Sequence, residues 1–173
     1  MNKTIFKINF LIVIIILIIG IVLGFFLTPA IKSEGSFVKV HSFSEIIQNN
    51  LTVNFSMASG ILTFGISTLL LLLFNGALIG ASVRSALTED RMGYVDIIFS
   101  LVPHGIFELP ALILSAMVGF QLIEFIILMY ITNENYKRLI KLFIKKIIIM
   151  LLVMIILTVI AGMVEWYITF QLF

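Results

Sequence analysis

Cysteine is absent from this sequence and charge is scarce. The lack of cysteine in all 173 residues excludes disulfides, thiolate nucleophiles and cysteine metal ligands. Charged residues make up 12% of the chain and apolar residues 61%, and the mean hydropathy is +1.23. Soluble domains usually carry about 25% charged and 45–50% apolar residues. The composition therefore predicts an all-α, polytopic transmembrane helical bundle.

Several patterns that support catalysis are also missing. No Gly-rich phosphate loop and no Ser/His/Asp set is evident, and the sequence has one His-x-x-x-Glu in place of the His-Glu-x-x-His of metalloproteases. We expect no catalytic, metal or cofactor-binding residues and no enzymatic activity. The net charge of +2 comes from residues that flank apolar runs, so we expect the lipid bilayer rather than nucleic acid as the partner.

The apolar runs predict one integral membrane domain over residues 1–173. At ~20 residues per crossing, about five spans are expected, near residues 5–27, 52–75, 97–115, 117–131 and 147–167, with an external segment at 28–50. The first run is too long for a signal peptide and is interpreted as a retained span. The external segment is expected to hold a short interfacial helix, with Ser42 or Ser44 as its N-cap.

Two segments are too long or too interrupted for one straight crossing. The uncharged run 46–83 is expected to tilt, to break or to continue along the cytoplasmic surface, and Asn75-Gly76 is the predicted place for a break. Pro103 and Pro110 interrupt the run 97–131, which predicts two short, broken helices that enter and leave the membrane on the same side.

The basic residues predict the orientation. With five crossings and the N-terminus inside, nine lysines and arginines face the cytoplasm, among them Lys3, Lys7, Arg84 and the five basic residues of 137–146, while Lys32 and Lys39 lie outside. This bias predicts an N-in, C-out, multi-pass protein of the cell membrane.

His104 and Glu108 are the first candidate functional residues. They are four residues apart and so share one face of a helix. An ionised carboxylate inside a membrane costs roughly 2.5–3.5 kcal/mol on insertion scales, and it therefore needs a partner or a wet cavity. Two interpretations remain open: a proton- or cation-sensitive site, and a hydrogen-bonded pair that fixes helix packing.

Asn75, Gly76, Gly80 and Glu165 complete the candidates. Gly76 and Gly80 have G-x-x-x-G spacing, as do Gly20 and Gly24, and such small faces let helix backbones approach closely within a monomer or between subunits. Packing within the monomer is the favoured interpretation. Glu165 precedes Trp166 and Tyr167, so an interfacial acid is favoured over a catalytic one.

Three stretches resemble the stage II sporulation protein M family. They are Asn75-Gly76 with Gly80, Pro103-His104-Gly105-x-x-Glu108-x-Pro110, and Ala161-Gly162-x-x-Glu165. The resemblance implies a five-span membrane component and makes Asn75, His104, Glu108 and Glu165 the residues to map first. In spore formers, the named member works in a complex with peptidoglycan-degrading partners during engulfment.

Two functions are compatible with these features. The first is a non-enzymatic membrane scaffold or assembly component that binds other membrane proteins or a second copy of itself. The alternative is a small-solute or ion permease with a mid-membrane His104/Glu108 site.

Overall fold

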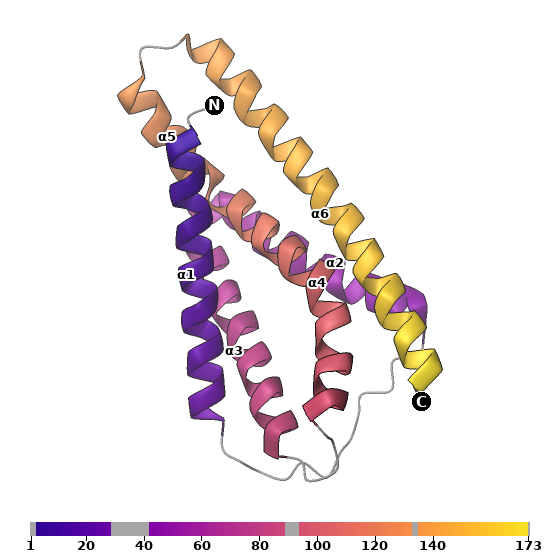
Figure 1. Ribbon diagram of the computed structural model, residues 1–173. Coiled ribbons are helices and arrows are strands. Elements are labelled where there is room, and N and C mark those ends of the chain that lie inside the picture. Colours follow the sequence, from indigo (N-terminus) through magenta and orange to yellow (C-terminus); the bar gives the residue numbers. More distant parts are fainter. Residues whose placement is uncertain (1–2, 29–41, 89–93, 133–134, 173) are drawn as a thin grey trace.

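The described residues form six α-helices and one short 3-10 helix. The computed structural model describes the chain over residues 3–28, 42–88, 94–132 and 135–172, and its side chains over 3–28, 42–88, 105–132 and 135–167. The elements are, in order, α1 (Lys3–Leu27), α2 (Phe43–Ala58), the 3-10 helix η1 (Ser59–Thr63), α3 (Ile66–Thr88), α4 (Tyr94–Gly119), α5 (Gln121–Ile131) and α6 (Tyr136–Leu172). The predicted all-α fold is confirmed (Figure 1).

Three of these helices are long and apolar enough to cross a membrane. They are α1, α3 and α6, and α4 with α5 makes a fourth if this pair, which bends by 48° at its break, counts as one span. The fold is therefore compatible with a multi-span membrane protein. Among the described residues, α2 is not one of these helices, because its 16 residues are too few.

α1 and α3 pack side by side and run in the same direction (Figure 1). A Cβ on Gly76 would lie 2.8 Å from the Leu17 carbonyl oxygen, and one on Gly20 would lie 2.6 Å from the Leu73 carbonyl oxygen. Further along both helices, the Arg84 guanidinium lies 5.4 Å from the centre of the Phe25 ring. Arg84 is thus at the opposite end of α1 from Lys3, which corrects the prediction that placed both residues on one side.

The run 46–83 is broken earlier in the chain than predicted. α2 ends at Ala58 and α3 begins at Ile66, so the predicted span 52–75 is divided between two helices. The break predicted at Asn75-Gly76 is wrong, because α3 continues through both residues. The actual reversal is at Phe64 and Gly65, whose φ angles are 52° and 80°. This left-handed conformation suits glycine, which has no Cβ.

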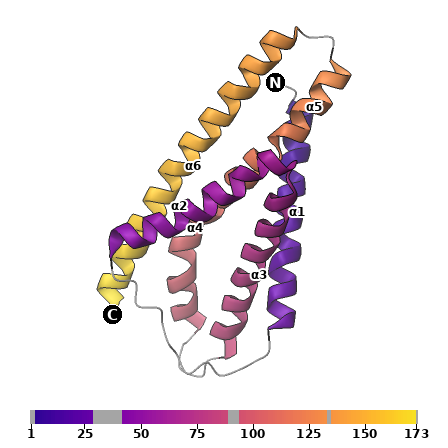
Figure 2. The same ribbon diagram turned by 180° about the vertical axis from the view of Figure 1, so that it is seen from behind.

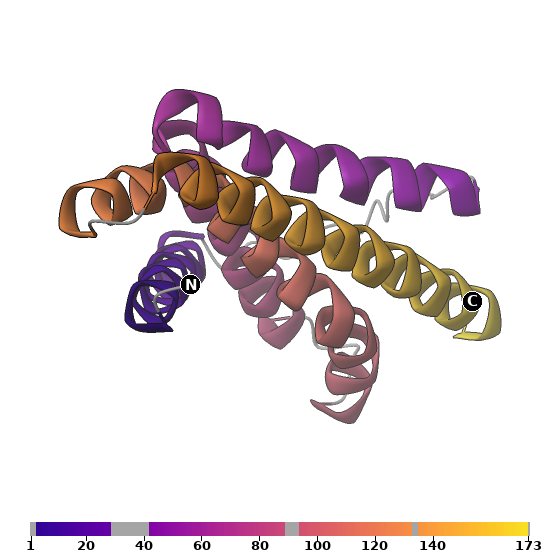
Figure 3. The same cartoon turned by 90° about the horizontal axis from the view of Figure 1, so that it is seen from above.

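The start of α2 agrees with the sequence. Ser42 is extended and its hydroxyl accepts a hydrogen bond from the Glu45 backbone N–H at 3.3 Å, which confirms it as the N-cap. Residues 29–41 of the predicted external segment lie outside the described residues. In the views from behind and from above, α2 lies along one side of the bundle, outside α4 and α6 (Figures 2 and 3).

α4 and α5 form one bent path through the molecule. α4 continues through both Pro103 and Pro110, and the break comes later, at Phe120, between α4 and α5. α5 ends where α6 begins, at the end of the bundle opposite to the start of α4 (Figure 1). The sequence had predicted that the two helices enter and leave on the same side. This prediction is wrong, because α4 begins at one end of the bundle and α5 ends at the other.

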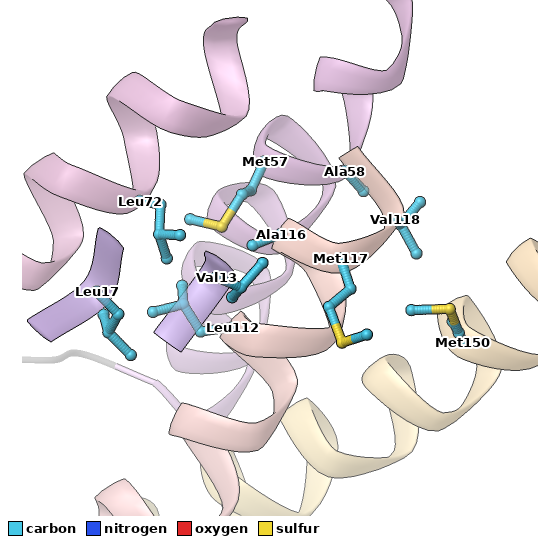
Figure 4. Close-up of a cluster of buried hydrophobic side chains, with 10 residues drawn as sticks. All are labelled: Val13, Leu17, Met57, Ala58, Leu72, Leu112, Ala116, Met117, Val118 and Met150. Carbon is cyan, nitrogen blue, oxygen red and sulfur yellow. The ribbon is translucent and has the colours of Figure 1, made fainter. Parts of the chain in front are cut away.

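The two helix breaks meet at Thr68. Its hydroxyl donates to the Met57 carbonyl at 2.8 Å, at the end of α2. A Cβ on Gly60 or on Gly119 would overlap this hydroxyl, and Gly65 packs on the Phe120 ring. Glycine is therefore required where the reversal after α2 touches the end of α4. Next to this junction lies a core of buried side chains from five helices (Figure 4), formed by Val13, Leu17, Met57, Ala58, Leu72, Leu112, Ala116, Met117, Val118 and Met150.

Candidate functional site

A buried ion pair joins α5 to α6. The Lys146 Nζ lies 2.5 Å from the Glu124 Oε1, and their side chains are only 10% and 4% exposed. Lys146 is in the basic stretch 137–146, which the structure makes the first part of a helix that continues to Leu172. A buried carboxylate is costly unless it is paired and hydrogen-bonded, and Glu124 satisfies both conditions.

Two side-chain amides complete the environment of Glu124. The Asn9 Nδ2 and the Gln121 Nε2 donate to the Glu124 Oε2 at 3.2 and 3.0 Å. Both amides also donate to the Met117 carbonyl, at 3.3 and 3.2 Å. Met117 lies in the last turn of α4, where backbone carbonyls have no partner within the helix. The network therefore satisfies the end of α4 and connects α1, α4, α5 and α6.

A cavity of about 570 Å³ adjoins this network. It lies between α5 and α6, and most of its lining residues are apolar. The Lys146 Nζ lies 5.0 Å from the centre of the Phe6 ring, at one wall. Two more cations line the cavity, Arg138 and Lys145, while Glu124 is the one acid among the lining residues that the structure describes. The volume is within the range of about 300–1,000 Å³ that is typical of small-molecule sites.

A second polar cluster lies between α2, α4 and α6. The Asn54 Nδ2 donates to the Thr158 hydroxyl at 3.0 Å, and the Ser115 hydroxyl donates to the Asn54 Oδ1 at 3.1 Å. Thr158 in turn donates to the Met154 carbonyl. All three polar side chains are buried. Because each bond connects two helices or satisfies a backbone group, this cluster fixes α2 against α4 and α6.

The outer face of α2 is polar and exposed. Its exposed side chains include Gln48, Asn49, Thr52 and Ser56, and a shallow groove of about 600 Å³ runs along the helix. The inner face is buried and includes Ile46 and Met57. α2 therefore presents hydrogen-bonding groups outward in a molecule whose other helices expose mainly aliphatic and aromatic side chains.

The structure places the predicted residues in different surroundings. The side chain of His104 lies outside the described residues, so its predicted pairing with Glu108 stays a prediction; Glu108 is half-buried on α4. Asn75 donates to the Leu71 carbonyl of its own helix at 2.8 Å. Glu165 is half-buried on α6, beside Trp166, whose ring lies 6.2 Å from that of Phe43. The described residues contain no cluster of three potential metal ligands.

The glycines of the first and last stretches lie at helix contacts. Gly76 and Gly80 are buried against α1. In the last stretch, a Cβ on Gly162 would lie 2.8 Å from the Ile47 Cγ1 of α2, and Ala161 is fully buried. Small residues at these positions let α3 approach α1, and α6 approach α2.

Sequence reasoning missed the Glu124 network. Lys146 was interpreted as a topology signal, and no local pattern marks its partner Glu124, which is 22 residues away. Asn9 is a single amide in an apolar first span, and that isolation was the signal available. An isolated polar residue in a span usually needs a partner from another helix.

Comparisons with known proteins agree with one another. The model of the family "Stage II sporulation protein M" matches residues 10–170. Uncharacterized protein MJ0793 of Methanocaldococcus jannaschii is 36% identical over 129 residues, which cover 74% of this chain and 71% of that protein. Uncharacterized protein MJ0706 of the same organism is 31% identical over 135 residues, 77% of this chain and 58% of that protein.

No solved structure matches the chain. The family match covers nearly its whole length, and it includes all three stretches on which the resemblance was based. This chain therefore belongs to the stage II sporulation protein M family.

Proposed function

We propose that this protein is a non-enzymatic assembly component of a complex in the cell membrane, and that it binds another membrane protein through the outer face of α2. The observation that carries the proposal is the exposed row of polar side chains on that face, including Gln48, Asn49, Thr52 and Ser56. Two arguments support the proposal. The first is that α2 lies at the depth of the hydrocarbon, and the second is that exposing its polar face to lipid costs free energy.

The proposed topology has five membrane-crossing segments, with the N-terminus inside and the C-terminus outside. The segments are α1, α2 with η1, α3, the bent pair α4–α5, and α6. Lys3, Lys7 and the basic start of α6 lie at one end of the bundle (Figure 1), and the positive-inside rule makes that end cytoplasmic. The count agrees with the sequence-based prediction, although the predicted second span is divided between two segments and the predicted third and fourth spans form one.

The position of η1 supports α2 as a crossing. Gly20 of α1 faces Gly76 of α3, and the two parallel helices rise equally, so Ile66 is level with Phe10. α2 and η1 therefore extend from the Trp166 end of α6 to about the level at which the apolar part of α1 begins. Over this depth, the outer face of α2 would meet the hydrocarbon of the bilayer.

Lipid is a poor environment for that face. Transfer of an amide into hydrocarbon without a hydrogen-bond partner costs roughly 4–8 kcal/mol, and the face carries Gln48 and Asn49. A helix of another membrane protein with polar side chains would satisfy these groups, since Asn, Gln, Ser and Thr hydrogen-bond across helices in membranes.

The test is co-purification of a tagged chain from its native membrane in mild detergent, followed by quantitative mass spectrometry. We expect a stoichiometric membrane-protein partner with the wild type. The double variant Gln48→Leu/Thr52→Leu should lose most of that partner, because it removes hydrogen-bonding groups from the centre of the face. Its thermal stability in detergent should be equal to the wild type or higher, because both side chains are exposed.

The matched control is Ser82→Leu, which makes the same kind of change at an exposed position on α3. It should retain the partner. A chain that purifies alone, or a double variant that keeps its partner in full, would contradict the proposal. Equal loss from the control would show that the effect does not belong to α2.

A further inference from the structure

The cavity between α5 and α6 carries an inference that is independent of α2. We propose that it binds an anionic phospholipid, with the phosphate near Lys145 and Lys146 and an acyl chain along the apolar wall. Neither the family match nor the proposed assembly role assigns a ligand to this place. The inference depends on three properties of the cavity: its lining, its opening and its charge.

The lining suits a hydrocarbon chain. Phe125, Leu128, Leu139 and Phe143 are among the apolar side chains that form most of the wall. The rings of Phe125 and Phe143 pack 4.6 Å apart and join α5 to α6 at this wall. An apolar space of about 570 Å³ offers water few hydrogen-bond partners, whereas an acyl chain that enters it from the bilayer only exchanges one apolar environment for another.

The opening faces the surroundings of the bundle. Leu142 and Ile149 line the cavity, and both side chains are exposed, so the cavity is open along α6. A chain that enters between α5 and α6 therefore comes from the lipid phase. This geometry favours a membrane lipid over a free solute, which would have to approach through water.

The charge of the lining residues favours a lipid with an anionic headgroup. Among its described lining residues, Arg138, Lys145 and Lys146 are cationic and Glu124 is the one acid. Lys146 is engaged with Glu124, and Lys145 is exposed beside it. The lining thus has an excess of positive charge next to an apolar wall. In the proposed topology this end faces the cytoplasmic leaflet, where anionic lipids give a negative surface potential.

The experiment is a titration of the purified full chain in detergent, followed by native mass spectrometry. The probes are dioleoyl phosphatidylglycerol and dioleoyl phosphatidylcholine, which have the same chains and differ in net charge. We expect at least a tenfold lower Kd for phosphatidylglycerol. Lys145→Gln should raise that Kd about fivefold, as expected for the loss of one cationic contact, and leave the Kd for phosphatidylcholine unchanged.

Three variants control the result. Lys141→Gln removes the same charge from an exposed position of α6 outside the cavity and should change Kd by less than twofold. Lys145→Arg keeps the charge and should retain the affinity. Leu139→Trp fills the cavity and should weaken binding of both lipids, while its melting temperature reports whether it has folded.

Several outcomes would overturn the proposal. Equal affinity for the two lipids would mean that the cavity has no preference for anionic headgroups. Displacement of phosphatidylglycerol by inorganic phosphate at millimolar concentration would identify a free-anion site instead. An equal loss in Lys141→Gln and Lys145→Gln would assign the effect to the general charge of α6.

Discussion

The side chain of Glu124 connects α5 with α1 and α6. Its two carboxylate oxygens contact Lys146 of α6, Asn9 of α1 and Gln121 of α5. A buried ion pair is often no more stabilising than an apolar pair of the same size, but removal of one partner is strongly destabilising. The network therefore specifies which helices meet, and each member depends on the others.

This dependence predicts a non-additive pair of variants. Glu124→Gln and Lys146→Met should each destabilise the protein by about 3–5 kcal/mol, because each leaves the other group buried without its counter-charge. The double variant should be more stable than the sum of the two predicts, with a coupling energy of about 0.5–3 kcal/mol. Thermal unfolding in detergent measures all four proteins.

The control is Lys145→Met, which removes the neighbouring, exposed lysine. It should change stability little, since exposed charges contribute about 0–1 kcal/mol. If the two single variants simply add, Glu124 and Lys146 do not stabilise each other and the network is incidental to the fold.

The sequence allowed only part of this residue-scale picture to be predicted. The N-cap at Ser42 was predictable because a cap is a local pattern. The Glu124 network was not, because its hydrogen-bonded pairs are separated by up to 115 residues. A single sequence contains no signal for which distant polar residues meet.

At the scale of elements, glycine determines how closely α1 and α3 approach. Gly20 and Gly24 of α1 lie against Gly76 and Ala77 of α3, so that backbone packs on backbone. The spacing of these glycines was visible in the sequence, and packing within the monomer was the favoured interpretation. The parallel direction of the two helices was not visible, because it depends on the reversal after α2.

Gly76→Leu should therefore separate α1 from α3. Its side chain would be directed at the Leu17 carbonyl and the Gly20 Cα, and overpacking of this kind typically costs 1–3 kcal/mol. Each kcal/mol should lower Tm by roughly 2–4 °C for a protein of this size. The expected result is a lower Tm in detergent, measured by the loss of helical circular dichroism.

Ser82→Leu, on the exposed face of the same helix, is the comparison and should leave Tm nearly unchanged. A Gly76→Leu variant as stable as the wild type would show that α1 and α3 are held together elsewhere.

The helix breaks show why elements were predicted better than their boundaries. Asn75-Gly76 has a weak intrinsic helix preference, yet α3 continues through it, and Gly76 packs there against α1. The break falls instead at Gly60 and Gly65, where Thr68 and Phe120 need the space. Tertiary contacts thus decided between two segments with similar local preferences.

At the scale of the whole molecule, the arrangement of the helices places Arg84 and Lys146 at opposite ends of the bundle. Counting basic residues along the sequence had placed both on one side. The count overlooked that α3 runs parallel to α1, which returns the chain to the end where α1 finishes (Figure 1). The proposed topology accordingly has Arg84 outside.

Single-cysteine labelling tests this topology, and the chain has no cysteine of its own to add background. Leu87→Cys, in the last turn of α3, should react with a membrane-impermeant maleimide on intact cells. Asn135→Cys, just before α6, should react only after permeabilisation. Both positions are exposed, so accessibility should depend on the side of the membrane.

The cysteine-free wild type gives the background, and Lys3→Cys should behave like Asn135→Cys. Protection of Leu87→Cys in intact cells, together with labelling after permeabilisation, would put Arg84 inside and contradict the parallel arrangement in the membrane.

The parallel pair also has a consequence for biosynthesis. All of α1 and α3 lies within the first 88 residues, so their backbone contact can form while α4 is still inside the ribosome. The junction at Thr68 cannot be completed at that time, since Gly119 and Phe120 have not yet emerged. Because chains fold from the N-terminus as they are made, the nascent chain would contain a packed α1–α3 pair before α4 is available. The surface at Thr68 that later contacts α4 would be uncovered during that time.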